Sequence, residues 1–172
     1  MGALTLVGTP ATTVHALEEQ YADLPVSVEV ATVFSLSLDN PQLVFQRLSP
    51  GKTNVLGEGR FFNELTCRVN TGRPWYLKAQ LLSLKHVGRD YTLPASLLQW
   101  KAVEVVGAVE QPAGRYDFQK FAEQPTVIYA SQGSERLGQT VVIRLQYSLS
   151  CPLDAPAGDY VGQLIFTMAE SP

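Results

Sequence analysis

The residue types that most often perform chemistry are few in this sequence and stand in no recognisable catalytic pattern. The histidines are His15 and His86, and neither belongs to an HExxH-type metal motif. No serine lies in a G-x-S-x-G elbow, and Glu18, Glu19 and Glu58 have no partner carboxylate at an identifiable spacing. The glycines match neither the Walker nor the dinucleotide-binding pattern. We therefore expect a protein that is not an enzyme and has no cofactor.

Metal binding has equally weak support in the sequence. The acidic loop residues Asp39, Asp154 and Asp159 could bind calcium, but no D-x-D-x-D-G pattern surrounds them. Two isolated cysteines do not supply the four ligands that a structural zinc site usually needs. The expectation is that the protein has no metal site.

Composition and charge narrow the remaining classes of function. The chain has 172 residues, enough for one domain with a substantial core, and 45% of them are apolar. A net charge of −3 and scattered basic residues do not indicate nucleic-acid binding. No apolar run approaches the roughly 20 residues that a transmembrane helix requires. We expect neither a nucleic-acid partner nor a transmembrane segment.

The elements that would position any site are strands, because apolar residues recur at every second position in many segments. The longest such segment is VSVEVATVFSLSLD, residues 26–39, which predicts one long strand or two strands joined by a bend. Helix is expected only at 14–24 and as a single turn near Pro94. The expected inward-facing residues include Val26, Val28, Val30, Phe34, Leu36, Leu38, Leu43, Phe45, Leu65, Cys67, Val69, Trp75, Leu77, Ala79, Leu81, Val141, Ile143, Leu145, Tyr147, Leu149, Cys151, Leu164, Phe166 and Met168.

The segment LDAPAGDYVGQLIFTM, residues 153–168, has the pattern of a tyrosine corner followed by a strand. In such a corner a turn leads into a strand whose first tyrosine bonds its hydroxyl to nearby backbone, which here places Tyr160 against residues 154–157. Strands separated by short turns, together with this corner, predict an all-β fold. We expect an antiparallel Greek-key β-sandwich of immunoglobulin-like type, with residues 25–172 as the sandwich and 1–24 as an N-terminal extension.

Cys67 and Cys151 share the inward parity of their strands, which makes them a candidate disulfide. A bridge requires the two Cα atoms to lie near 5.5 Å apart, which neighbouring or facing strands would allow. The alternative is a pair of buried free thiols.

The quoted strand patterns, with the turn LSPGKT and the segments TCRVNTGRPWYLKAQ, LPASLLQWKAV and APAGDYVGQLIFTM, give the chain a likeness to a known group. Residues 25–168 resemble secreted immunoglobulin-like β-sandwich proteins of prokaryotic surfaces and fibres, such as donor-strand pilins, spore-coat-U-like subunits and camelysin-like matrix fibre proteins. The resemblance implies an extracellular or cell-surface location and a structural or adhesive role. It transfers no functional residue.

The N-terminal extension is a candidate edge or donor strand. Leu4, Leu6 and Val7 form one apolar strand-like piece, and Val14 ends a second, β-branched one. Such a segment can cover an edge of its own sandwich or pair with the sheet edge of a neighbouring subunit. The first sixteen residues lack the charged region of a complete signal peptide, although they end in Val14-His15-Ala16, which resembles a cleavage site.

Two functions agree with these expectations. The first is a non-enzymatic structural subunit of an extracellular surface layer or pilus-like fibre, which self-associates by N-terminal strand donation. The alternative is a carbohydrate- or protein-binding sandwich module of adhesin type, which would need exposed aromatic side chains on one face. The candidates for such a platform are Tyr76, Tyr91, Trp100 and Tyr116.

Overall fold

A computed structural model describes residues 25–112 and 114–172 of the chain. The chain divides into two compact units, 1–30 and 31–172, and the first contains the expected N-terminal extension 1–24 together with residues 25–30. In the first unit the described residues, 25–30, form no regular secondary structure and are exposed. The expected helix at 14–24 lies outside the described residues.

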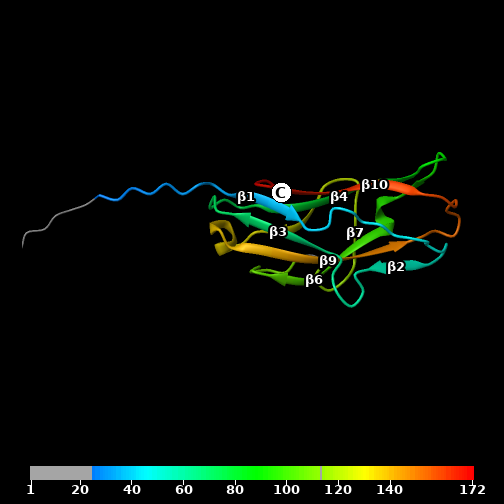
Figure 1. Ribbon diagram of the computed structural model, residues 1–172, viewed down its shortest axis with the longest axis horizontal. Coiled ribbons are helices and arrows are strands. Elements are labelled where there is room, and N and C mark those ends of the chain that lie inside the picture. The colour runs from blue at the N-terminus through cyan, green and yellow to red at the C-terminus, as the bar shows by residue number, and fades with distance from the viewer. Residues whose placement is uncertain (1–24, 113) are drawn as a thin grey trace, which may run out of the picture. The chain divides into compact units, whose positions relative to one another are not determined.

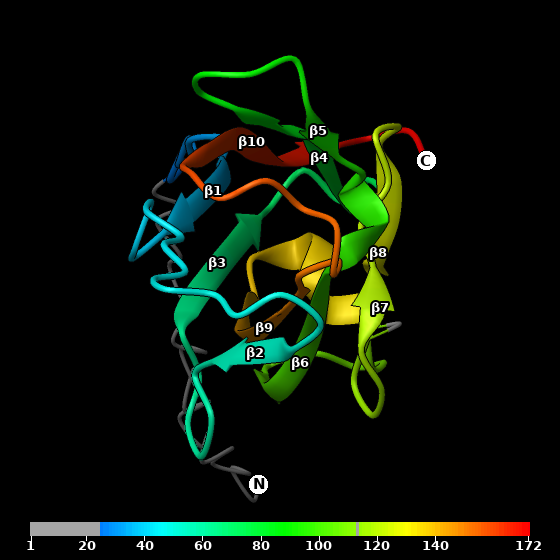
Figure 2. The same ribbon diagram turned by 90° about the vertical axis from the view of Figure 1, so that its right-hand side faces the viewer.

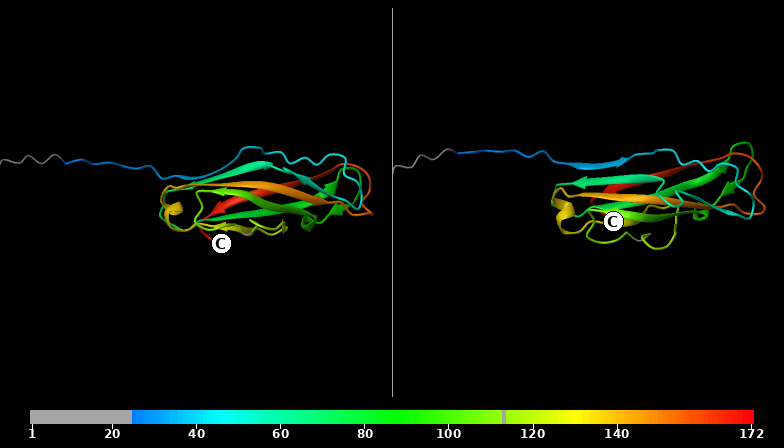
Figure 3. Two further views of the ribbon diagram at one scale, coloured as in Figure 1. Left: turned by 90° about the horizontal axis from the view of Figure 1, so that it is seen from below. Right: turned by 60° about the horizontal axis from the view of Figure 1, so that its bottom comes forward.

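The second unit is a β-sandwich of two antiparallel sheets, which confirms the expected all-β fold (Figures 1 and 2). One sheet has the strand order β1-β3-β9-β6-β7, and β2 also pairs with β9, beyond the end of β3. The other has the order β10-β4-β5, and β8 pairs with the same edge of β4 as β5 does. The long axes of the strands in the two antiparallel sheets are roughly aligned with one another (Figure 3). The strands are β1 (Phe34–Leu38), β2 (Thr53–Leu56), β3 (Asn63–Val69), β4 (Tyr76–His86), β5 (Thr92–Leu93), β6 (Leu98–Val106), β7 (Gln119–Lys120), β8 (Thr126–Ala130), β9 (Thr140–Ser150) and β10 (Tyr160–Ala169).

The core lies between the sheets and is formed by alternate residues of the inner strands, as the period-two pattern predicts. Along β9, for example, Val141, Ile143 and Leu145 are fully buried, while the residues between them are half-buried. The neighbouring strands supply the rest of this layer. Its buried apolar members are Leu65, Cys67, Val69, Trp75, Leu77, Ala79, Leu81, Ala95, Leu98, Trp100, Ala102, Phe121, Ile128, Tyr129, Val141, Ile143, Leu145, Tyr147 and Leu149.

Two short 3-10 helices complete the second unit, η1 (Ala95–Leu97) and η2 (Gly133–Leu137). Glu135 of η2 is fully buried, and its carboxylate accepts hydrogen bonds from the Tyr129 hydroxyl at 2.6 Å and from the backbone N–H of Gln132 at 2.7 Å. Burial and this carboxylate together raise the pKa of Tyr129. A buried carboxylate with these partners fastens η2 to β8.

The sequence predicts one long strand or two strands joined by a bend from Val26 to Leu38, but in the structure only Phe34–Leu38 forms a strand, β1. Its partner β3 ends at Val69, directly opposite Phe34, so the ladder has no further strand residue with which to pair. Alternation of apolar residues predicts a strand only where a neighbouring strand is present to accept its hydrogen bonds. Val26, Val28 and Val30 are consequently 77–79% exposed instead of buried.

The turn before β10 has the bonding expected of a tyrosine corner. The Tyr160 hydroxyl donates a hydrogen bond to the Pro156 carbonyl oxygen at 2.7 Å, inside the range 154–157 that the sequence indicates. His86 packs edge-on against the Tyr160 ring, with 5.1 Å between ring centroids. Gly158 has φ of 147°, and a Cβ there would collide with the His86 ring, so this corner requires glycine.

Removing the Tyr160 hydroxyl should weaken the corner without disturbing the strand. We expect Tyr160→Phe to lower the midpoint of thermal unfolding by about 2–6 °C, because one intramolecular hydrogen bond has a modest net effect on stability. Differential scanning calorimetry measures this shift. Tyr116→Phe is the matched control, since that side chain is 75% exposed. Equal midpoints for the two variants would contradict the corner's contribution.

Candidate functional site: an open groove beside the edge strand β10

One side of the sandwich is bordered by two edge strands that belong to different sheets. β1 is the terminal strand of its sheet and β10 of the other, and the two lie beside each other (Figures 1 and 2). Among the described residues, no strand pairs with the outer edge of either one. Their free backbone N–H and C=O groups are the kind of template to which an additional strand can bind.

The two edge strands differ from the inner strands in their burial. No residue of β1 or β10 is buried, whereas β3 and β9 each present a regular series of buried residues. The inward-facing Leu164, Phe166 and Met168 of β10 pack against the core, yet all three remain only partly buried. The apolar layer between the sheets is therefore incomplete on this side.

A groove of about 940 Å³ occupies this side of the sandwich and reaches the core. Its floor includes Leu81 of β4 and Leu149 of β9, so both sheets contribute to it. The chain from 38 to 50 borders it, with Leu43, Phe45 and Leu48 partly buried there. The other apolar and aromatic lining residues are Leu38, Val44, Leu84, Leu93, Leu98, Tyr147, Cys151, Tyr160, Val161, Leu164 and Phe166.

The tyrosine corner forms one end of the groove. Residues 155–160 line it, and Tyr160 contacts Tyr91 edge-on at 6.2 Å as well as His86. The His86 Nδ1 accepts a hydrogen bond from the Gly88 N–H at 2.9 Å, so its Nε2 is left to donate to the Ala157 carbonyl oxygen at 3.2 Å. Desolvation raises the pKa of Tyr160, which therefore remains a hydrogen-bond donor at neutral pH.

The lining of the groove is mostly apolar, with few charged side chains. Arg47 and Asp159 are its charged side chains, and each stands among apolar or neutral neighbours. In the parts of the chain that the structure describes, no group of three or more histidine, cysteine or acidic residues could hold a metal ion. The acidic loop residue Asp39 instead accepts a hydrogen bond from the Glu64 N–H at 2.7 Å. Within 25–112 and 114–172, no helix is both long enough and apolar enough to span a membrane.

The structure separates the two cysteines, so the expected disulfide is absent and both thiols are free. Cys67 lies opposite Val141 at the start of β9, whereas Cys151 follows the other end of that strand. At about 3.4 Å per residue they are roughly 30 Å apart, far beyond the reach of a disulfide. Shared parity puts both side chains on one face of a sheet but does not say how far apart they are along it.

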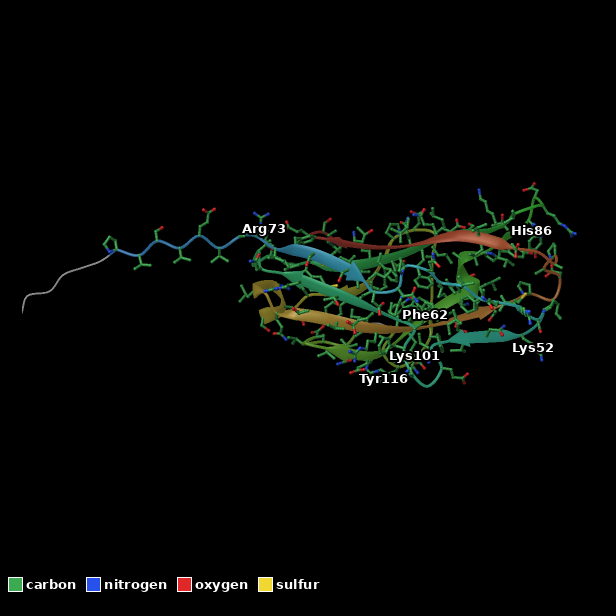
Figure 4. All side chains as sticks on the ribbon, in the orientation of Figure 1. Lys52, Phe62, Arg73, His86, Lys101 and Tyr116 are labelled. Carbon is green, nitrogen blue, oxygen red and sulfur yellow. The ribbon has the colours of Figure 1, made fainter. Side chains whose placement is uncertain are left out.

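The aromatic residues proposed for glycan binding do not form a common platform. Trp100 is 3% exposed and packs against Gly114, where a Cβ would collide with the indole. Tyr116 is exposed, in the loop after β6, and lies far from the tip that carries His86 (Figure 4). Tyr76 and Tyr91 are both half-buried. Tyr76 is the first residue of β4, whereas Tyr91 lies in the turn that follows the last residue of β4.

The proposed donor residues Leu4, Leu6, Val7 and Val14 lie outside the described residues. The groove itself brings together Cys151 and Tyr160, which the sequence singles out for other reasons. Its other lining residues include several that the sequence predicts as inward-facing: Leu38, Leu43, Phe45, Leu81, Tyr147, Leu149, Leu164 and Phe166. Alternation identifies the inward face of a strand but not whether anything covers that face. The signal that could have located the groove is the position of β10 as the last patterned segment, since a terminal strand often lies at a sheet edge.

No family model matches the sequence, and no curated protein matches it.

The two thiols should differ sharply in reactivity. Cys67 is fully buried, and desolvation raises its pKa to about 12, so it holds almost no reactive thiolate at pH 8. Cys151 is partly exposed at the groove. We expect a thiol reagent at pH 8 to label one cysteine rapidly in the folded protein and two after unfolding.

Mass spectrometry after labelling identifies which cysteine has reacted, and Cys151→Ser should abolish the fast phase. Two fast thiols in the folded protein, or none before reduction, would contradict the arrangement of these residues.

Proposed function

We propose that the protein is a non-enzymatic structural subunit of an extracellular surface layer or pilus-like fibre. In this proposal its copies join by strand donation, the N-terminal extension of one copy filling the groove of the next. The observation that carries the proposal is the open apolar groove between the chain from 38 to 50 and the edge strand β10. The resemblance of residues 25–168 to immunoglobulin-like fibre subunits supports the extracellular setting.

The free edge of β10 favours an extended polypeptide as the occupant of the groove. β10 has ten residues, and its inner edge pairs with β4 along nearly its whole length. A strand added to its other edge would gain main-chain hydrogen bonds, and alternate side chains would enter the groove. An apolar small molecule would leave these backbone groups without partners.

Residues 25–30, which follow the N-terminal extension within the first unit, have the side-chain pattern that such an occupant needs. Val26, Val28 and Val30 share one parity and alternate with Ser27 and Glu29, so a strand formed here has one apolar and one polar face. Each of the three valines is at least 77% exposed. Full burial of one such side chain stabilises an interface by roughly 1.5–3 kcal/mol. The candidates Leu4, Leu6, Val7 and Val14 of the N-terminal extension precede these valines in the chain and would lengthen the donated segment.

Donation between copies would produce a chain of subunits. The donor segment and the acceptor groove are different surfaces of the same polypeptide, so each copy offers one of each. A head-to-tail contact of this kind continues indefinitely unless its rotation closes a ring. A filament is therefore the expected assembly.

A charge on the donor face should prevent assembly without affecting the fold. Val28→Asp introduces a carboxylate that is solvated in the free subunit but buried in the groove of a neighbour. We expect association at least about tenfold weaker, from the loss of one buried valine and the cost of desolvating the charge. Analytical ultracentrifugation and negative-stain electron microscopy of the full chain measure this effect.

Leu137→Asp is the matched control, because Leu137 is 73% exposed on η2 and does not line the groove. This variant should assemble as the wild type does. A wild-type protein that stays monomeric at high concentration, or a Val28→Asp variant that still forms normal filaments, would overturn the proposal.

A further inference from the structure

Arg47 is the positively charged residue of the groove lining, and it lies in the chain from 38 to 50 that borders the groove. Its side chain is exposed, and no ion pair formed within residues 25–112 and 114–172 includes it. Asp159, the negatively charged lining residue, belongs to the tyrosine corner. A guanidinium carries five N–H donors in a fork that matches a carboxylate, so Arg47 is available to an acidic ligand.

The backbone at Arg47 directs this charge away from the core. Its φ is 53°, a left-handed conformation that residues with a side chain seldom adopt. Phe45 and Leu48 are three residues apart and would face opposite sides of a regular strand, yet both are half-buried against the core. The bend at Arg47 therefore keeps two apolar side chains inside and leaves the charge exposed at the mouth of the groove.

The first unit of the chain, residues 1–30, carries charge of the opposite sign only. It contains neither lysine nor arginine, and Arg47 is the first of either type in the whole sequence. The carboxylates of this unit are Glu18, Glu19, Asp23 and Glu29. A donor segment taken from this unit would thus be attracted by Arg47 and repelled by Asp159.

The valines of the donor segment do not by themselves fix where it lies along the groove. Val26, Val28 and Val30 repeat at every second residue, so a strand that slides by two residues presents the same apolar face. Glu29 breaks this repeat, because it is the one charged residue between positions 24 and 38. It lies on the face opposite the valines, and it is exposed in the free chain.

We infer that Arg47 sets the register of the donated strand by forming an ion pair with Glu29 of the next copy. This inference rests on the proposed function. With the valines directed into the groove, Glu29 faces outward, toward the mouth where Arg47 is exposed. A slip of two residues keeps an apolar face in the groove but separates the two charges, so the ion pair favours one register over its neighbours.

The test reverses each charge in the full chain, singly and together. Arg47→Asp and Glu29→Arg each place like charges in contact, and we expect each to weaken association at least about fivefold at low ionic strength. Both changes in one chain should restore association to within about twofold of the wild type, because the pair is re-formed with its signs exchanged. Sedimentation velocity over a concentration series measures association. Aspartate is chosen at position 47 because it tolerates positive φ.

Two further comparisons separate an ion pair from an effect on folding. Arg60→Asp and Glu58→Arg are the matched controls: both residues are exposed in the turn after β2, neither lines the groove, and each variant should associate as the wild type does. The deficit of the single variants should shrink at about 1 M salt, where the screening length falls to about 3 Å. A misfolded Arg47→Asp subunit would be restored neither by salt nor by Glu29→Arg.

Moving the carboxylate tests the register directly. Ser27→Glu combined with Glu29→Ser keeps the composition and net charge of the chain but shifts the negative charge by two residues. If Arg47 sets the register, this variant should associate at least about fivefold more weakly, because the strand must either separate the charges or leave a valine outside the groove. A general attraction between an acidic segment and Arg47 predicts association equal to that of the wild type.

The possible failures are distinguishable. Wild-type assembly that depends on Val28, combined with a double charge reversal that does not restore association or a shifted carboxylate that has no effect, would overturn the role of Arg47 and leave the proposed function in place. A wild-type chain that never assembles would overturn the proposed function itself.

Discussion

The incomplete cover over the apolar layer between the sheets is the constraint on which the rest of this structure depends. Burial of apolar surface is the main force that holds two sheets together, and it requires cover on every side of the shared layer. Here β3, β9 and β4 are covered, but β1 and β10 are the last strands of their sheets and contain no buried residue. The half-buried Leu164 and Phe166 are the direct result.

Several local features keep this open side in a defined shape. The Tyr160 hydroxyl and His86 fasten the corner at one end of the groove, each through a bond to the backbone of residues 156–157. At the start of β1, Asn70 holds Ala31 and Val33 in line with the strand. The backbone at the corner end of the groove is therefore bonded in place, which would suit the strand-receiving site that we propose.

The exposed valines and the exposed groove are complementary in chemistry. An alternating apolar segment is an aggregation hazard when it is free, and so is an uncovered sheet edge. A chain that carries both reduces both hazards if one covers the other. Strand donation between copies is the arrangement that we propose for this purpose.

The sequence by itself determined the fold class and the inward faces of the inner strands, because the backbone of a strand alternates its side chains with a fixed period of two. It also located the tyrosine corner, because a turn followed by a strand-initial tyrosine is a local pattern. Alternation carries no information about which strands are neighbours or where a strand lies along its partner. The distance between Cys67 and Cys151, the early end of the ladder before Phe34 and the exposure of β10 all depend on those neighbours. Only the tertiary structure decided them, since burial and strand pairing are properties of contacts between segments far apart in the chain.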